Sequence, residues 1–329
     1  LRCHFIYQKK KLRWAIPKGS LEEDTLNLIN STVLKVKGTE RSYRPYINDE
    51  EIEVKILRPQ EIPKLVEQGF YDIGITGRDW LEETEAKVKV LMDLEYGKVK
   101  LVLAGPSRLN KDPNALLRDY YEKGSPLRIA TEYPNITSKY MMSLAEYKRL
   151  YGSQRPMVIT PWFTVGDNKN VQIFLSFGAT EAKPPEEADL IVDVTETGTT
   201  LRENGLTIIS EVMSSSAVLI ANEASLKDDK VKEKALDVVA LLKGAVEARK
   251  KLHIFVNVKE ENLNALLREL PSLKSPTVSK LSKEGWYAVN TVINEDDLLK
   301  IIPKLRKLAQ GLVVHKPTSI MPLEEINDA

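Results

Sequence analysis

The chain has 329 residues, with 48 lysine and arginine residues against 47 aspartate and glutamate residues and a net charge of +1. This balance excludes a protein whose main task is to wrap nucleic acid, because binding many phosphates requires an excess of cations. One cysteine and three histidines exclude an intramolecular disulfide, a multi-thiolate metal site and a histidine-rich metal centre. At roughly 150 residues per domain, the length predicts about two domains, or three.

No apolar run approaches the ~18 residues that a membrane-spanning helix requires. Residues 1–11 are basic and partly apolar, but they contain neither the long apolar stretch nor the small-residue cleavage site of a secretory signal. Together with the single cysteine, Cys3, this composition predicts a cytoplasmic protein with an N-terminal extension.

The N-terminal part of the chain alternates short apolar runs with helical patterns. The predicted strands are 12–16, 53–57, 72–76 and 99–104. Helices are predicted after Ser20, which has capping-box spacing with Glu23, and at 62–68 and 78–81. Because strands that alternate with helices build a largely parallel sheet, this region is predicted to be an α/β domain.

Gly105 and Pro106 mark a predicted crossing into a second lobe. Further strands are predicted at 127–131, 171–177, 190–194, 206–210 and 217–221. Residues 151–170 carry glycine, proline and asparagine without a clear period, and they are predicted to form a loop or a decorated hairpin. Residues 228–251 have an amphipathic pattern with Ala235 and Leu242 on one stripe, which predicts a long helix.

The C-terminal part of the chain changes pattern. Strands are predicted at 253–258, 277–282, 286–293 and 312–314, and helices at 262–270 and 296–308. The resulting order, β-α-β-β-α-β, is the signature of a ferredoxin-like domain and is typical of small regulatory domains.

The clearest chemical pattern lies at residues 189–201. An apolar strand ends in Asp193, and a turn rich in hydroxyl groups and glycine leads into a helix. Backbone N–H groups and threonine hydroxyls of such a turn can bind an anion, and the acid before it can accept hydrogen bonds from sugar hydroxyls. A phosphorylated ribose fits this pattern, and a plain strand–loop–helix with a threonine cap fits it equally.

Two other turns are candidate anion sites. The Lys-Gly-Ser turn at 18–20 precedes a predicted helix, where free N–H groups and a lysine could hold a phosphate, although many strand-to-helix turns have this composition. The segment 72–79 places glycines and an Arg-Asp pair at the carboxyl end of a strand, and Arg58 follows the preceding strand at the equivalent end. Since open α/β sheets bind ligands at these ends, the turns together predict a phosphate-rich pocket.

Seven runs in this sequence match, in order, the motifs of a known family. They are AIPKGSLE at 15–22, RSYRP at 41–45, LRPQEIP at 57–63, DIGITGRD at 72–79, RIATEYPN at 128–135, GATEAK at 178–183 and DVTETGTTL at 193–201. The ordered set resembles the ATP phosphoribosyltransferase family. The tail, with LKSPTVS at 273–279 and Gly285 before Trp286, is similar to the regulatory domain of the family's long form.

The resemblance implies an α/β fold with a two-lobed catalytic core like that of periplasmic binding proteins, followed by a C-terminal ferredoxin-like βαββαβ domain. The expected division is 1–104 with 204–250 for lobe I, 105–203 for lobe II with the phosphoribosyl-binding loop, and 251–329 for the regulatory domain. It also implies a homo-oligomer, from dimer to hexamer, without nucleic acid or membrane partners.

The implied reaction transfers the 5-phosphoribosyl group from phosphoribosyl pyrophosphate to N1 of ATP, as the first step of histidine biosynthesis, and histidine inhibits it. The nucleophile is a neutral ring nitrogen that needs no strong general base, so the enzyme mainly positions two polyanions and stabilises the leaving pyrophosphate. The implied Mg²⁺ would be held mainly by substrate and water oxygens.

Motif matching assigns the expected site residues. The expected catalytic residues are Asp193, which matches the acid that binds the ribose hydroxyls, with Lys18 and Arg58. The expected substrate-binding residues are Asp79, Tyr133, Glu181 and the 5-phosphate loop Glu196, Thr197, Gly198, Thr199, Thr200 and Leu201. The expected histidine-binding residues are Asn257, Leu273, Thr277, Val292 and Leu312.

One departure and one alternative accompany the resemblance. The 151–170 stretch is longer than the family usually has, which could alter lobe closure or assembly. The alternative function is a non-catalytic two-lobed nucleotide- or solute-binding or regulatory protein. The intact Thr-Gly-Thr-Thr loop at 197–200 favours the enzyme.

Overall fold

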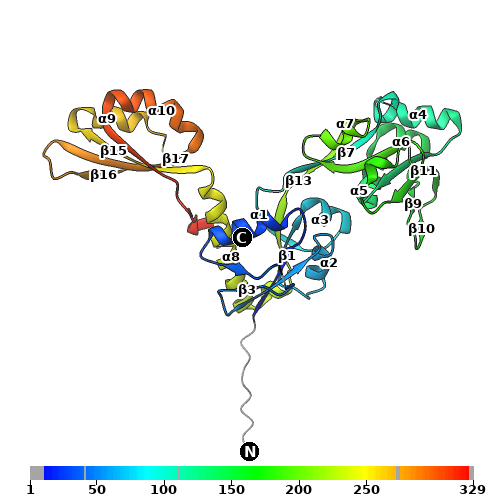
Figure 1. Ribbon diagram of the computed structural model, residues 1–329, viewed down its shortest axis with the longest axis horizontal. Helices are drawn as coiled ribbons and strands as arrows, with labels where there is room; N and C mark the ends of the chain where they lie inside the picture. The colour runs from blue at the N-terminus through cyan, green and yellow to red at the C-terminus, as the bar shows by residue number, and fades with distance from the viewer. Residues whose placement is uncertain (1–10, 41, 110, 272–274, 326–329) are drawn as a thin grey trace, which may run out of the picture. The chain divides into compact units, whose positions relative to one another are not determined.

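The computed structural model describes residues 11–325 apart from 41, 110 and 272–274 (Figure 1). The chain divides into two compact units. One comprises Arg13–Asp24 and Val54–Leu226, and the other comprises Thr25–Glu53, Lys227–Ala329 and the described part of Leu1–Leu12. Among the residues that the structure describes, no helix is both long and apolar enough to cross a bilayer.

The first unit contains a five-stranded sheet. Its order is β4 (Ile52–Leu57), β1 (Leu12–Pro17), β5 (Ile73–Gly77), β14 (Ala217–Ala221) and β6 (Lys89–Asp93). β1 and β5 are parallel, whereas β14 runs antiparallel to β5 and β6. Helix α2 (Ile62–Glu67) packs on one face so closely that a Cβ on Gly74 would lie 2.6 Å from Cγ2 of Ile62. This contact explains why β5 carries a glycine at a fully buried position.

A seven-stranded sheet forms the rest of this unit. Its order is β10 (Thr164–Val165), β9 (Pro156–Ile159), β11 (Asn168–Leu175), β8 (Leu127–Thr131), β12 (Leu190–Thr195), β7 (Val99–Pro106) and β13 (Leu206–Ser215). The strands β9, β11, β8 and β12 are parallel, so their carboxyl ends share one edge. That edge carries the residues that follow β8 and β12, which include much of the candidate site.

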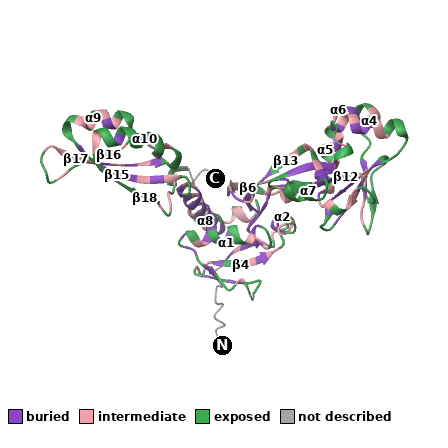
Figure 2. Ribbon diagram, turned by 45° about the horizontal axis from the view of Figure 1, so that its top comes forward, coloured by how far each residue is buried: buried purple, intermediate pink, exposed green. Residues whose placement is uncertain are grey.

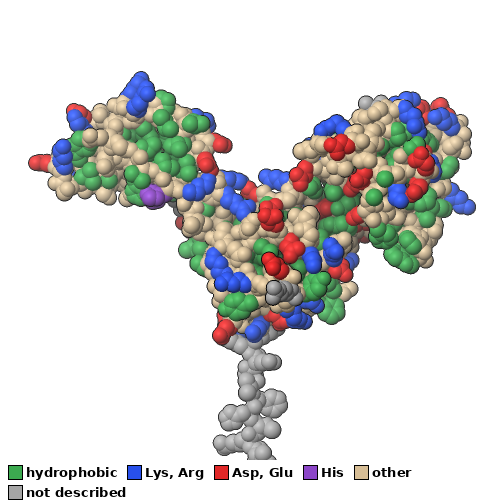
Figure 3. All heavy atoms as spheres, in the orientation of Figure 1, with side chains coloured by type: hydrophobic (Ala, Val, Ile, Leu, Met, Phe, Trp, Pro, Cys, Tyr) green, Lys and Arg blue, Asp and Glu red, His purple; other side chains and the backbone are tan. Residues whose placement is uncertain are grey.

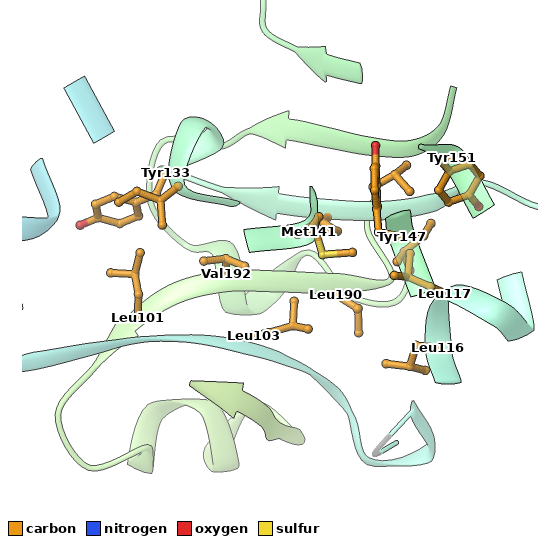
Figure 4. Packing of buried hydrophobic residues seen from close by; sticks show 14 residues of the cluster. Leu101, Leu103, Leu116, Leu117, Tyr133, Met141, Tyr147, Tyr151, Leu190 and Val192 are labelled. Carbon is orange, nitrogen blue, oxygen red and sulfur yellow. The ribbon is translucent and has the colours of Figure 1, made fainter. Parts of the chain in front are cut away.

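Helices cover both faces of the seven-stranded sheet. Three helices cover one face: α4 (Pro113–Lys123), α5 (Pro134–Ser143) and α6 (Ala145–Tyr151). Figure 4 shows strand residues such as Leu103 and Leu190 in one cluster with Met141 and Tyr147 from the helices. On the other face, Leu201 of the short helix α7 (Thr199–Glu203) packs against Ile191. The site loop is therefore anchored through a buried leucine.

The sheets differ from the predicted lobe boundaries. β7 and β13 pair with each other from Leu206 opposite Pro106 to Ser215 opposite Val99, and both belong to the seven-stranded sheet. The expectation placed residues up to 104 and from 204 onward in the other lobe, so it cuts through β7 and assigns β13 to the wrong sheet. Both runs are apolar in sequence, and only their hydrogen-bonded partners decide which sheet they join.

The segment 151–170 forms the hairpin that was one of its two predicted forms. β9 and β10 pair antiparallel, with Thr164 opposite Ile159. The N–H of Thr160 donates to the carbonyl of Phe163 at 2.9 Å and closes the turn. Gly166 has φ +100°, and a Cβ there would lie 2.1 Å from the carbonyl oxygen of Pro156. The glycine that signalled irregularity in the sequence therefore permits this crossing of backbones.

The second unit contains the predicted long helix and the predicted tail domain. Helix α8 (Asp229–Ala248) begins where Asp228 accepts the N–H of Lys230 at 3.1 Å, and its buried residues include the predicted stripe (Figure 2). A helix and strands also precede it in the chain: α1 (Glu22–Ser31) and the β2–β3 hairpin (Val36–Lys37 with Tyr46–Ile47). The segment Ser319–Met321 returns to α8, where the N–H of Ile320 donates to the carbonyl of Gly244 at 2.9 Å.

The tail has the ferredoxin-like topology that the pattern predicts. Its sheet order is β16 (Thr277–Lys280), β17 (Trp286–Asn294), β15 (Lys251–Lys259) and β18 (Ala309–His315), with every neighbouring pair antiparallel. Helices α9 (Glu260–Glu269) and α10 (Glu295–Leu308) cover one face, and their leucines share a core with the strands (Figure 1). The fold class is therefore confirmed: α/β, with a two-sheet core and a C-terminal βαββαβ domain.

Candidate active site

Asp193 lies on β12 at the carboxyl edge of the seven-stranded sheet. One carboxylate oxygen accepts the N–H of Val194 at 2.7 Å, and the other accepts the hydroxyl of Thr180. Burial raises the pKa of Asp193 above its ordinary value, and the negative charge of Glu181 adds to this effect. The strand thus presents a half-buried acid whose orientation is fixed by its neighbours.

The loop after Asp193 is ordered by its own hydroxyl groups. The N–H of Gly198 donates to the Thr195 hydroxyl at 2.7 Å, and the hydroxyls of Thr197 and Thr199 lie 2.9 Å apart. Arg202 reinforces the turn by donating to the carbonyl of Thr197 at 3.1 Å. Gly198 has φ +73°, a conformation that residues with a side chain rarely adopt. The loop is therefore shaped before any ligand binds.

A cavity of about 430 Å³ opens between this loop and its neighbours. Its walls are Ser20, Val99, Glu181, Asp193, Val194, Thr195, Glu196, Thr197, Thr199, Thr200 and Leu201. The structure thus brings seven of the expected site residues to this cavity. Of the expected loop, only Gly198 is not part of the wall, and the side chain of Leu201 is mostly packed in the core. A cavity of this size, with an acid and several hydroxyls, suits a phosphorylated sugar.

A second cavity of about 480 Å³ adjoins the first and shares Val99, Thr195 and Glu196 with it. Its other walls are Arg78, Asp93, Lys98, Lys100, Ser214, Ser215 and Ser216. The sequence analysis missed the two lysines and the serines. Their only signal is position: Lys98 and Ser214–Ser216 flank the apolar strand runs at 99–104 and 217–221, and Lys100 lies within the first run.

Lys18 and Arg58 come from neighbouring turns at one end of the five-stranded sheet. The N–H of Lys18 donates to the carbonyl of Leu57 at 2.7 Å, and a Cβ on Gly19 would lie 3.8 Å from Nη1 of Arg58. The turn is closed by the N–H of Gly19, which donates to the Glu22 carboxylate at 3.3 Å, one residue before the predicted Ser20–Glu23 pair. Ser20 of the same turn lines the first cavity. Lys18 therefore lies two residues from the cavity wall in the sequence, and Arg58 lies beside the turn.

Asp79 and Tyr133 contact each other. The Tyr133 hydroxyl donates to one Asp79 carboxylate oxygen at 3.0 Å, and the Ser215 hydroxyl donates to the other at 2.8 Å. Both side chains are buried. Burial, with the nearby Asp79 charge, raises the pKa of Tyr133 well above its ordinary value, so its hydroxyl stays protonated. Neither residue lines the two cavities described above.

Glu132 is a further acid at the same edge, and the sequence analysis did not single it out. It follows β8, whose last residue Thr131 pairs with Val192, so Glu132 and Asp193 end neighbouring parallel strands. Glu132 accepts the N–H of Gly178, burial raises its pKa, and the charge of Asp193 raises it further. Its sequence signal is the one that Asp193 gave, an acid directly after an apolar strand.

The expected histidine-binding residues fall on two faces of the tail sheet. Asn257, Thr277 and Val292 share register with Ala288, Asn290 and His253, which places all of them on the face away from the helices. Leu312 pairs with the buried Val256 and packs into the core on the helix face. Leu273 lies outside the described residues. Three of the five expected residues, Asn257, Thr277 and Val292, therefore lie on the same face of the tail sheet.

The described residues contain no group of three or more histidine, cysteine, aspartate or glutamate side chains placed to hold a metal ion. Acidic and basic side chains are also interspersed on the face shown in Figure 3, without one extended basic patch.

The site combines a two-sheet α/β core, an acid near the end of a strand, a threonine-glycine loop and a cavity of about 430 Å³. Together with the sequence matches that follow, these features identify the class of protein as a pentosyltransferase. The sequence profile described as ATP phosphoribosyltransferase matches residues 58–244, and the profile of the HisG C-terminal domain matches 248–316. The chain belongs to the ATP phosphoribosyltransferase family. Enzymes of this family join ATP and phosphoribosyl pyrophosphate in the first step of histidine biosynthesis.

Similar proteins support the assignment. The ATP phosphoribosyltransferase of Solibacter usitatus (strain Ellin6076) is 39% identical over 311 residues, covering 93% of this chain and 97% of the relative. That of Thermodesulfovibrio yellowstonii (strain ATCC 51303 / DSM 11347 / YP87) is 37% identical, covering 95% and 99%. The structure of the ATP phosphoribosyl transferase (HisG:HisZ) complex from Thermotoga maritima has a chain with a TM-score of 0.55 and 28% identity, covering 72% of this chain and 98% of that one.

Proposed function

We propose that this enzyme binds phosphoribosyl pyrophosphate at the Asp193 cavity, with the ribose hydroxyls on Asp193 and the 5-phosphate on loop 196–201. The cavity itself carries the proposal, because it joins a half-buried acid with a pre-shaped turn of hydroxyl and N–H groups. Such groups stabilise a phosphate without a large excess of cations. Catalysis then consists of holding adenine N1 in line with C1 of the ribose.

Lys18 and Arg58 are proposed to stabilise the pyrophosphate as it leaves. Their turns lie together at the end of the five-stranded sheet, and Ser20 of the same turn borders the cavity. Cations placed where negative charge develops lower the barrier more than they tighten substrate binding. Glu181, Asp79 and Tyr133 are proposed to form the nucleotide side. Glu181 lines the first cavity, and the hydrogen-bonded Asp79–Tyr133 pair contacts the second cavity through Ser215.

The family acts with a divalent metal, which we propose to be Mg²⁺. The donor set fits a hard cation held mostly by substrate and water oxygens, because carboxylates such as Asp193 and Glu196 border the cavity while no three-residue cage exists among the described residues. Asp193 and Glu196 would supply protein oxygens. The ion would neutralise charge on the pyrophosphate group.

Turnover separates the enzyme from a non-catalytic binding protein with the same fold. We expect the protein, mixed with ATP, phosphoribosyl pyrophosphate and Mg²⁺, to form an adduct whose absorbance differs from that of ATP. Substrate binding measured by calorimetry under the same conditions serves as the control. Binding without adduct formation under any salt or metal condition would contradict the catalytic role.

Histidine is proposed to inhibit the enzyme by binding the face of the tail sheet that carries Asn257, Thr277 and Val292. The side chains on this face present an amide, a hydroxyl and an apolar group, a combination that suits an amino acid. We expect Asn257→Ala to raise the histidine concentration for half-inhibition by about tenfold, while Asn264→Ala on helix α9 leaves it unchanged. Equal inhibition of both variants and the parent enzyme would place the inhibitor elsewhere.

The remaining proposals concern organisation. We propose that the functional division follows the sheets, with lobe II extending over β7 to β13, and that 251–329 is the regulatory domain. We also propose a homo-oligomer, from dimer to hexamer, that acts in the cytoplasm. Light scattering with and without histidine tests the assembly, and cell fractionation tests the location.

A further inference from the structure

Glu83 is a buried carboxylate that the proposed reaction does not use. It lies on α3 (Arg78–Thr84), one helical turn after Asp79, and only 7% of its surface is exposed. A carboxylate is costly to bury without hydrogen-bond donors. The partners of Glu83 therefore indicate what the residue does.

The carboxylate of Glu83 is hydrogen-bonded to the start of helix α5. One carboxylate oxygen accepts the N–H of Asn135 at 3.0 Å, and the other accepts the N–H of Ile136 at 2.9 Å. In return, the side-chain amide of Asn135 donates to the backbone carbonyl of Glu83 at 2.9 Å. Tyr133, the residue before the helix, provides no side-chain cap, and Pro134 has no N–H. Glu83 therefore caps α5 from a different helix.

Helix α3 also contacts the side chain of Tyr133, the residue just before α5. The Asp79 carboxylate accepts the Tyr133 hydroxyl at 3.0 Å, and the ring of Trp80 lies 4.5 Å from the Tyr133 ring, centroid to centroid. Thus three residues of one helix hold both the side chain of Tyr133 and the backbone that follows it. Since α3 follows β5 and α5 follows β8, the contact joins elements that belong to different sheets.

We propose that Glu83 is a positioning residue: by capping α5, it fixes the backbone after Tyr133 and holds the Tyr133 hydroxyl on Asp79 at the nucleotide side of the site. This inference rests on the proposed role of Asp79 and Tyr133 in binding ATP. Loss of the cap lets Tyr133 and the start of α5 move away from α3. Binding of ATP is then weakened, whereas binding of phosphoribosyl pyrophosphate is not.

The surroundings of Glu83 give this contact a pH dependence. Burial raises the pKa of Glu83 to about 7, against the opposing effects of the Asn135 and Ile136 N–H groups and of Lys139. Lys139 on α5 and Glu85 after α3 are the charged groups that face it, and they pair at 2.7 Å. A carboxyl with a raised pKa holds its proton more tightly in the closed contact than in water. The contact is therefore strongest below the ordinary value near 4.5 and weakens as the pH rises through about 7.

Steady-state kinetics of Glu83→Ala and Glu83→Gln in the full-length enzyme test the proposal. We expect Glu83→Ala to raise KM for ATP about tenfold with little change in KM for phosphoribosyl pyrophosphate. Glu83→Gln stays neutral and retains one acceptor, so we expect it to restore much of the affinity and to remove the contribution of Glu83 to the pH dependence of KM for ATP. Glu82→Gln, on the exposed side of α3, is the control and should behave as the parent.

A double variant with Tyr133→Phe tests whether Glu83 acts through Tyr133. We expect the combined effect of Glu83→Ala and Tyr133→Phe on KM for ATP to be smaller than the product of the single effects. A combined effect equal to the product of the single effects, an unchanged Glu83→Ala enzyme, or a pH dependence of KM for ATP that is the same in Glu83→Gln as in the parent would each overturn the proposal. If Glu83→Ala does not fold, Glu83→Gln carries the test. A normal Tyr133→Phe enzyme overturns the site assignment itself, whereas a defective one beside a normal Glu83→Ala overturns only the positioning role.

Discussion

The two halves of the candidate site are built in different ways. The proposed phosphoribosyl side is one continuous segment, in which Asp193 lies near the end of a strand and the loop up to Leu201 follows it, with hydrogen bonds among the residues of the segment. The nucleotide side is assembled from α3 and the start of α5, with Asp79 and Tyr133 separated by 54 positions in the chain. A local site depends on backbone conformation, whereas an assembled site depends on packing between helices.

The largest expected effect is on the local side. Asp193→Ala removes the acid that we propose accepts hydrogen bonds from the ribose hydroxyls. We expect kcat/KM for phosphoribosyl pyrophosphate to fall roughly 5- to 150-fold, which corresponds to a loss of about 1–3 kcal/mol. The measurement is initial-rate kinetics with each substrate varied. Glu203→Gln, exposed on α7, is the control. Unchanged kinetics of Asp193→Ala would refute its assignment.

A glycine pair tests whether the loop depends on its backbone conformation. Gly198 and Gly205 have φ +73° and +71°, so alanine at either position costs about 1 kcal/mol of stability through strain. A Cβ at Gly198 would lie 3.2 Å from Ile208, whereas nothing lies within 4 Å at Gly205. We expect only Gly198→Ala to raise KM for phosphoribosyl pyrophosphate, by roughly tenfold, while thermal unfolding shows a loss for both. Equal KM values in the two variants would show that the loop tolerates the change.

The smallest expected effect is on the assembled side. Tyr133→Phe removes one buried hydrogen bond to Asp79, which is worth about 1 kcal/mol, or roughly fivefold in KM for ATP. Tyr140→Phe removes a hydroxyl that lies 2.6 Å from the Ser210 hydroxyl, and it serves as the control because Tyr140 lies on α5, the helix that Tyr133 precedes. If both variants raise KM for ATP equally, the effect belongs to the stability of α5 and not to the Tyr133–Asp79 pair.

Most of the Asp193–Leu201 segment could be predicted from the sequence alone. An apolar run that ends in an acid, followed by a glycine and threonine turn, predicts a strand, a loop and a helix because each depends on neighbouring residues. The same reasoning predicted the order of the tail elements. It missed Glu132, although that residue also follows an apolar strand directly. It also missed Lys98 and Lys100, because only the tertiary structure places them with Glu196 and Arg78 around the second cavity.

The sequence by itself determined the family, the ferredoxin-like order of the tail and the strand–turn–helix that carries Asp193 and the threonine-glycine loop, because motifs and hydrophobic periods are properties of contiguous residues. Tertiary structure decided which sheet β7 and β13 join, which face of the tail sheet Leu312 occupies, and that Glu83 caps α5. These features depend on hydrogen-bond register and on contacts between distant segments. Such pairings are selected by the free energy of the whole fold, and no local pattern records them.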